Sequence, residues 1–117
     1  MNPLLKKEPS NLILHVGTND AIEKSEGQIK NELNNLTNYI TEKLPQCKVF
    51  LSLPTLRIDN SAAERTLREV RKYFTDYPRT IEHRNIDDTC LAKKGLHLNP
   101  KGTGRLAINY ISIMKCL

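Results

Sequence analysis

Two short polar stretches carry residue types that could take part in acyl-transfer chemistry. The first is Gly17-Thr18-Asn19-Asp20, which follows an apolar run, and the second contains His97, just before an Asn-Pro pair. An asparagine amide can donate a hydrogen bond to the negative oxygen that develops in acyl transfer, and a histidine can serve as general base. Asn19 and His97 are therefore candidate catalytic positions if the fold brings them together.

The apolar run before the first polar stretch, from Leu12 to Val16, is almost continuously hydrophobic. This pattern is typical of a parallel strand that is covered on both faces. Ligands of parallel sheets bind beyond the carboxyl ends of the strands, which is where Asn19 falls. Gly17 permits a sharp turn, and Asn19 and Asp20 can bond nearby backbone amides, so the same turn could instead be a structural helix start.

The next segment predicts a helix and then a second strand. Ser25 and Gln28 have the spacing of a capping box. Apolar residues then recur every three or four positions, as in a helix laid on a sheet: Ile29, Leu33, Leu36, Ile40 and Leu44. Residues 48–53 form a short β-prone apolar run, and its carboxyl end should lie beside Asn19.

The remaining sequence repeats this alternation. Ser61 and Glu64 again have capping-box spacing, and they begin a helix that should end near Pro78. Its apolar face is Leu67, Val70, Tyr73 and Phe74. Residues 80–86 are a weaker strand candidate. Asn99 and Pro100 then predict the start of a last helix, with these residues turned inward: Leu106, Ala107, Tyr110, Ile111 and Met114.

Length and composition indicate one ordinary globular α/β domain over residues 1–117. Alternating strands and helices are typical of a parallel sheet. No apolar run approaches the roughly 20 residues that span a bilayer, and no signal peptide is evident. The three cysteines, Cys47, Cys90 and Cys116, are far apart, so they indicate neither a zinc site nor a disulfide framework. We expect reduced thiols in a cytoplasmic protein.

The formal net charge of +5 permits attraction to nucleic acid. The densest basic run has helical spacing and consists of Arg65, Arg68, Arg71 and Lys72. Glu64 and Glu69 are mixed with it, and no aromatic residue is interleaved to stack bases. This pattern favours a solvated helix face over a phosphate-binding stripe.

The two polar stretches resemble blocks of the SGNH hydrolases, the GDSL-type esterases. Residues 17–20 are similar to the Gly-x-Asn-Asp block, and residues 95–102 (Gly-Leu-His-Leu-Asn-Pro-Lys-Gly) to the block around the catalytic histidine. In wording, the chain looks closest to esterase-like domains in the first open reading frame of some animal non-LTR retrotransposons. The resemblance covers Pro3 to Met114. It implies a three-layer, flavodoxin-like α/β fold with a parallel sheet, here as a partial domain whose N-terminal strands are missing.

The resemblance also implies roles for individual residues. Asn19 matches the oxyanion-hole asparagine and His97 the base that activates the serine, with Gly17, Thr18 and Asp20 in support. The family hydrolyses acyl esters through a serine acyl-enzyme, so an acyl ester or lipid is the implied substrate, and no cofactor is implied.

Two departures from the family pattern predict that this chain is inactive alone. The family's nucleophilic serine lies before the Gly-x-Asn-Asp strand, and no serine of this chain is placed in a strand-to-helix elbow. Ser52 is nearest to the rim of the sheet at the carboxyl ends of the strands, and it is interpreted as a strand-end serine bonded to backbone. The family's aspartate three residues before the histidine is Lys94 here, although Asp87 or Asp88 could substitute.

Alternatives from the residues alone remain open. His15 fits a satisfied core or interface histidine, and His83 an exposed one. A non-catalytic, retrotransposon-derived module that binds nucleic acid, lipid or a protein partner is the rival function. A missing neighbour strand would leave an apolar edge at Leu12 to Val16, which predicts self-association.

Overall fold

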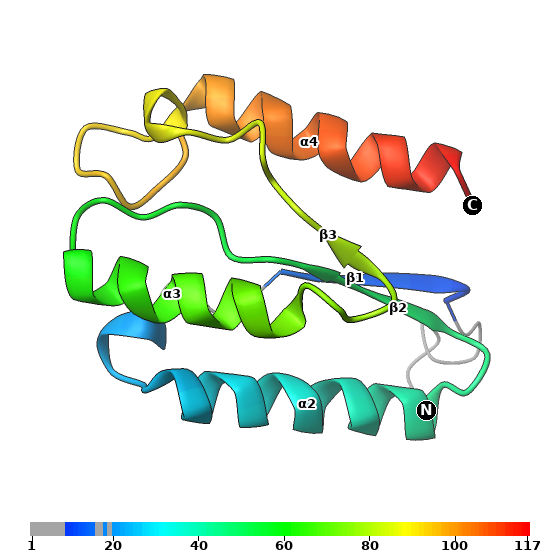
Figure 1. Cartoon of the computed structure of the whole chain (residues 1–117). Helices are drawn as coiled ribbons and strands as arrows, with labels where there is room; N and C mark the ends of the chain where they lie inside the picture. Colours follow the sequence, from blue (N-terminus) through cyan, green and yellow to red (C-terminus); the bar gives the residue numbers. More distant parts are fainter. Residues whose placement is uncertain (1–8, 16–17, 19) are drawn as a thin grey trace, which may run out of the picture.

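The structure is a computed structural model that describes residues 9–15, 18 and 20–117. Strands and helices alternate along the chain (Figure 1). The elements are β1 (Asn11–His15), the 3-10 helix η1 (Asp20–Ile22), α2 (Glu26–Lys43), β2 (Lys48–Ser52), α3 (Ser61–Phe74), β3 (Thr80–Ile81), the 3-10 helix η2 (Asp88–Cys90) and α4 (Pro100–Lys115).

The three described strands form one parallel sheet in the order β1-β2-β3. The register places His15 opposite Ser52, and Ser52 opposite Ile81. Figure 1 shows α2 and α3 on one face of this sheet and α4 on the other. The predicted α/β class with a parallel sheet is therefore confirmed, whereas the third strand is only two residues long instead of spanning 80–86.

The hydrophobic core lies between the sheet and the pair α2 and α3. Its fully buried members include Ile29, Leu67 and Val70, each at most 1% exposed, and they pack with Leu51 and Leu53 of the second strand segment. Burying each of these side chains contributes on the order of 1.5–3 kcal/mol. Because side chains alternate along a strand, Ser52 points to the opposite face, toward α4.

The helix starts follow local capping chemistry. At α2, the predicted capping box is present: Ser25 Oγ accepts from Gln28 N at 3.2 Å, and Gln28 Oε1 accepts from Ser25 N at 3.0 Å. At α3, the prediction was wrong by one residue, because Asn60 is the cap and accepts from Ala63 N at 2.9 Å. Glu64 does not reach back to the cap, since other partners take its carboxylate.

Two features of α3 and α4 differ from the predicted apolar faces. Tyr73 is 52% exposed, and α3 ends at Phe74, before Pro78. In α4, Ile111 and Met114 are 46% and 54% exposed, and Ala107 is exposed as well, although all three were expected to face inward. The reason is that α4 contacts chiefly η2 and the short β3, so only part of the helix has sheet beneath it.

The strand β1 lies at the edge of the described sheet. It pairs with β2 on one side, and its residues Leu12, Ile13 and Leu14 are only partly buried. An edge strand with apolar side chains is a template for pairing with another chain. Within the described residues, no helix combines the length and the apolar composition needed to cross a lipid bilayer.

Candidate active-site rim and a buried serine hub

The turn that follows β1 is fastened to the segment after β2 by one buried arginine. Arg57 is 1% exposed, and its Nη1 donates to the carbonyl oxygen of Thr18 at 2.7 Å. The same guanidinium donates two hydrogen bonds to the Asp59 carboxylate, from Nε to Oδ1 at 2.6 Å and from Nη2 to Oδ2 at 2.9 Å. Thr18, in the polar stretch predicted at the end of the first strand, therefore lies beside the segment that follows the second.

This pairing also sets the charge state of Asp59. A buried guanidinium requires a partner, and a bidentate carboxylate is the geometry that suits it best. The hydrogen bonds from Arg57 lower the pKa of Asp59, and the charges of Arg57 and, more weakly, His97 act in the same direction. Asp59 is therefore a fixed negative charge at the rim.

His97 reaches the rim on the loop that precedes α4. The Gly95 carbonyl accepts from the backbone N–H groups of Ile58 at 2.8 Å and Asp59 at 3.3 Å. Gly95 has φ +78°, and a Cβ there would lie 2.5 Å from Ile58 Cγ1, so only glycine fits. This docking places the loop that carries the exposed His97 beside the backbone of Ile58 and Asp59.

The expectation that Asp87 replaces the missing aspartate is not supported. Its carboxylate accepts from the backbone and hydroxyl of Thr89 and lies 3.9 Å from Arg105 Nη1. Asp88 begins the short helix η2 and has no hydrogen bond to His97 among the described residues. No carboxylate is hydrogen-bonded to the His97 ring in the described part of the chain, and Asp59, from a different part of the sequence, is influenced by His97 only weakly.

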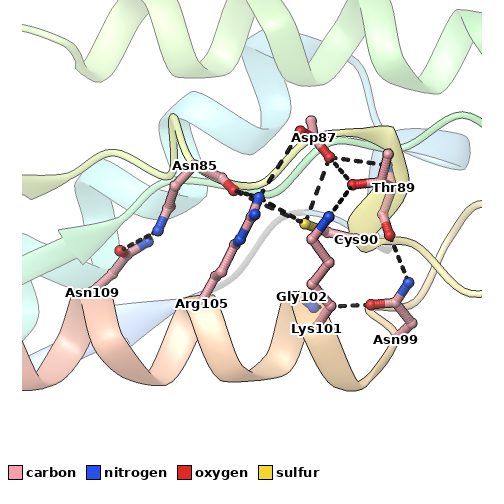
Figure 2. A network of polar contacts seen from close by, with 9 residues as sticks. All are labelled: Asn85, Asp87, Thr89, Cys90, Asn99, Lys101, Gly102, Arg105 and Asn109. Carbon is pink, nitrogen blue, oxygen red and sulfur yellow. Dashed lines mark hydrogen bonds and ion pairs between the residues drawn. The ribbon is translucent and has the colours of Figure 1, made fainter.

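The other residues of the second polar stretch anchor the start of α4 (Figure 2). Asn99 Oδ1 accepts from Gly102 N at 2.9 Å, while its amide donates to the carbonyls of Thr89 at 2.8 Å and Leu91 at 3.2 Å. A Cβ on Gly102 would stand 2.3 Å from the Cys90 carbonyl oxygen, so this position requires glycine. Asn99 and Gly102 thus have structural roles.

Three sequence-predicted residues, Val16, Gly17 and Asn19, lie outside the described residues, as does the side chain of Asp20. Of the predicted site, the structure brings together the Thr18 carbonyl and the loop that carries His97. Arg57 and Asp59, which join them, were missed. The available signal was a charged pair two residues apart, directly after the strand predicted to end beside Asn19.

Ser52 was expected to bond backbone, and this was wrong. Its Oγ lies 2.7 Å from His15 Nδ1, 2.7 Å from His83 Nε2 and 2.8 Å from Tyr110 Oη, and the residue is only 3% exposed. We call Ser52, His15, His83 and Tyr110 the Ser52 hub. His83, expected to be exposed, is a half-buried member of it.

The hydrogen-bond capacity of the Ser52 hydroxyl is filled by these partners. A hydroxyl has one donor and two acceptor sites, and three groups surround it. The amide nitrogen of Asn109 lies 2.9 Å from His83 Nδ1, and an amide nitrogen can only donate. His83 therefore carries its proton on Nε2 and donates it to Ser52, so it cannot act as the base that activates this serine.

Burial keeps the hub neutral. It lowers the pKa of His83 to about 4, with a further contribution from the charge of His15. It also lowers the pKa of His15 and raises the pKa of Tyr110. The His15 and His83 rings meet edge to face, with centroids 5.8 Å apart.

A cleft of about 570 Å³ lies between the segment after β2, the last turns of α3 and the segment after β3. Leu53, Leu56 and Ile86 are among its apolar lining residues, and His83 borders it. Its Arg71 and Arg84 are paired with Glu64 and Glu82, each at 2.7 Å. The cleft thus gives solvent access to one side of the Ser52 hub.

The basic run on α3 divides into two parts. Arg71 is used internally, because it donates to Glu64 and to the carbonyls of Pro54 at 2.7 Å and Thr55 at 2.8 Å. Arg65, Arg68 and Lys72 are exposed, and none of them forms an ion pair within the described part of the chain.

No protein-family model matches the chain, and no curated protein matches it significantly.

Proposed function

We propose that this chain is an SGNH hydrolase-like domain of the GDSL esterase type, with its acyl-binding rim formed by residues 17–20 and 95–98. The family's substrates are acyl esters. In this proposal Asn19 holds the oxyanion position and His97 the position of the general base. The single observation that supports it best is that residues 57–59 bond both stretches that resemble family blocks: Arg57 donates to the Thr18 carbonyl, and the backbone N–H groups of Ile58 and Asp59 donate to the Gly95 carbonyl.

The proposed chemistry of the rim rests on charge and exposure. His97 is exposed, so a substrate can reach its ring. Asp59 is held ionised by Arg57 and would stabilise the imidazolium that forms when a histidine accepts a proton. The family's aspartate is Lys94 here, and the Asp59 carboxylate is hydrogen-bonded to Arg57, so the rim lacks a carboxylate bonded to His97 among the described residues, in keeping with a domain that is inactive alone.

The domain by itself is catalytically silent in this proposal. Ser52 is buried, its hydroxyl is fully hydrogen-bonded, and His83 presents a proton to it instead of a lone pair. An activated serine needs a base with a free lone pair within hydrogen-bond reach, and a route for the substrate. Ser52 meets neither requirement.

The experiment that tests this function measures hydrolysis of p-nitrophenyl acetate and butyrate, together with labelling by a fluorophosphonate probe. We expect no labelling and no rate above that of His97→Ala. A rate or label that is lost in Ser52→Ala would show that Ser52 is a nucleophile and contradict the proposal. A rate or label that is lost in another serine variant would contradict the proposal that the domain alone is inactive. Arg68→Gln, far along α3, is the matched control.

A second candidate function is weak binding of nucleic acid through α3. The observation that favours it is the exposed set Arg65, Arg68 and Lys72, in a chain with net charge +5. Affinity for single-stranded oligonucleotides would fall with rising salt, because binding releases counterions, and Arg68→Glu would weaken it. Arg71→Glu is not a clean test, since Arg71 holds the segment after β2. Salt-independent or absent binding would exclude this candidate.

A further inference from the structure

The helix α4 makes two sets of polar contacts with the rest of the chain. Gly102 is the one buried residue within this helix, while Ile108, Ile111 and Met114 are at least 46% exposed. One set of contacts fixes its first turns to residues 85–91, as Figure 2 shows. The second set lies at its middle, where Asn109 and Tyr110 reach the Ser52 hub.

The second set depends on neutral histidines. Asn109 Nδ2 donates both to His83 Nδ1 and to Asn85 Oδ1, each at 2.9 Å. Protonation of His83 would place a second N–H against this amide nitrogen, so donor would face donor. If His15 were protonated as well, two positively charged rings would face each other with their centroids 5.8 Å apart, and like charges at this distance repel.

The surroundings offer these charges little compensation. Among the described residues, the side chains that contact the two rings are Ser52 from β2 and Tyr110 and Asn109 from α4, and all are uncharged. From α3, Arg71 and Lys72 line the cleft that His83 borders. The nearest charged side chains along the chain, Glu82 and Arg84, pair with each other. On α4, Arg105 donates to the Asn85 carbonyl and lies near Asp87. Among the described residues, no carboxylate is hydrogen-bonded to either ring.

Protons can reach the hub without unfolding of the chain. His83 borders the open cleft described above, and His15, at the end of the edge strand β1, is exposed as a residue, although its ring packs against Ser52 and His83 closely enough for desolvation to lower its pKa. We propose that the Ser52 hub is an acid-sensitive latch, which holds the middle of α4 to the sheet while both rings are neutral and releases it when they are protonated. The capped first turns of α4 stay attached, because Asn99 and Gly102 hold them without a histidine.

The test is amide hydrogen exchange of the full chain at neutral pH and at about pH 4.5, with protection factors corrected for intrinsic exchange. Protection of residues 110–115 should fall about tenfold or more on acidification. Each unit by which a histidine pKa is lower in the closed state than in the open state shifts the opening equilibrium up to tenfold at low pH. Protection of α2, with its own capping box, should change much less. In the double variant His15→Gln/His83→Gln, the acid-induced loss in α4 should disappear. The matched control His97→Gln alters the third histidine, outside the hub, and should keep the loss.

Two results would overturn the latch. One is an acid-induced loss in α4 that is equal in the unmodified chain and the double variant. The other is protection of α4 that persists in the unmodified chain after both rings have titrated, as followed by NMR of the histidine side chains. This second measurement needs no variant, so it decides the matter even if the double variant does not fold.

Discussion

Arg57 Nη1 donates to the Thr18 carbonyl oxygen at 2.7 Å, so a fully buried side chain links the segments that follow the neighbouring strands β1 and β2. The same guanidinium orients the Asp59 carboxylate, and the Asp59 backbone N–H donates to the Gly95 carbonyl in the loop that carries His97. The rim is thus built from three separate segments that share one arginine.

Replacing Arg57 by Met should destabilise the chain by about 2–4 kcal/mol, because the change removes the charge-assisted hydrogen bonds of a buried side chain, one of them to a backbone carbonyl. Urea unfolding followed by circular dichroism measures this free energy. Arg68→Met is the matched control, because Arg68 is exposed, and such surface changes stay within about 0.5 kcal/mol. Equal stability of both variants would contradict the role given to Arg57.

Two glycines of α4 should respond in opposite directions to alanine. At Gly102 a Cβ would be 2.3 Å from the Cys90 carbonyl oxygen, a contact with backbone that cannot yield easily, so Gly102→Ala should destabilise the chain. At Gly104 no atom lies within 4 Å of the added Cβ, so Gly104→Ala should stabilise the helix by up to about 1 kcal/mol. Thermal unfolding of the two variants checks this. A stabilised Gly102→Ala would show that α4 does not pack on residues 89–91 as described.

Stability should fall as pH drops from about 6.5 to about 4. The folded state holds the pKa of His83 at about 4 and also lowers the pKa of His15, so in this window the unfolded chain binds more protons. The stability that the neutral rings contribute is complete above about pH 6.5 and is lost toward the folded-state pKa. The lowered pKa values of Asp59 and Asp87 act only below their usual range, near pH 3.8 and lower.

Denaturant unfolding at several pH values measures this slope. The variant His83→Gln should flatten it, whereas His97→Gln should not. A slope that is the same in all three chains would show that the histidines of the Ser52 hub do not titrate with depressed pKa values.

The edge strand β1 should promote self-association. Its Leu12, Ile13 and Leu14 are partly buried, and its outer backbone groups have no strand partner in the described sheet. Sedimentation velocity at rising concentration should therefore reveal oligomers, and Ile13→Lys should reduce them, because a charge on an edge strand discourages pairing. A monomer at every concentration would rule this out.

Local signals explain which parts of this structure could be predicted. The start of α2 follows from Ser25 and Gln28, and that of α4 from Asn99 and Pro100, because a cap depends on residues only a few positions apart. The parallel sheet follows from two apolar runs. At α3, by contrast, Asn60 takes the place of Ser61 as the cap because Glu64 bonds Arg57 and Arg71 instead.

The site was predicted less completely, because its contacts join residues that are far apart in the sequence. His83 was predicted to be exposed, yet its ring forms a hydrogen bond with Ser52, 31 residues away in the sequence. The contact of Arg57 with Thr18 spans 39 positions and leaves no periodic trace in the sequence. Partners of this kind depend on strand order, which becomes visible only in the folded chain.

The acyl-binding rim is tested most directly by titrating the 15N-labelled chain with sodium hexanoate, the product-like carboxylate of a short acyl ester, followed by NMR. We predict chemical-shift changes confined to residues 18–22, 57–59 and 95–98, weakened in Asn19→Ala and His97→Ala and unchanged in Arg68→Gln. Hexyltrimethylammonium, with the same chain and the opposite charge, should leave these residues unshifted. Hexanoate shifts that avoid this rim, or that persist in both Asn19→Ala and His97→Ala, would contradict an acyl-binding rim built from the two family-like stretches.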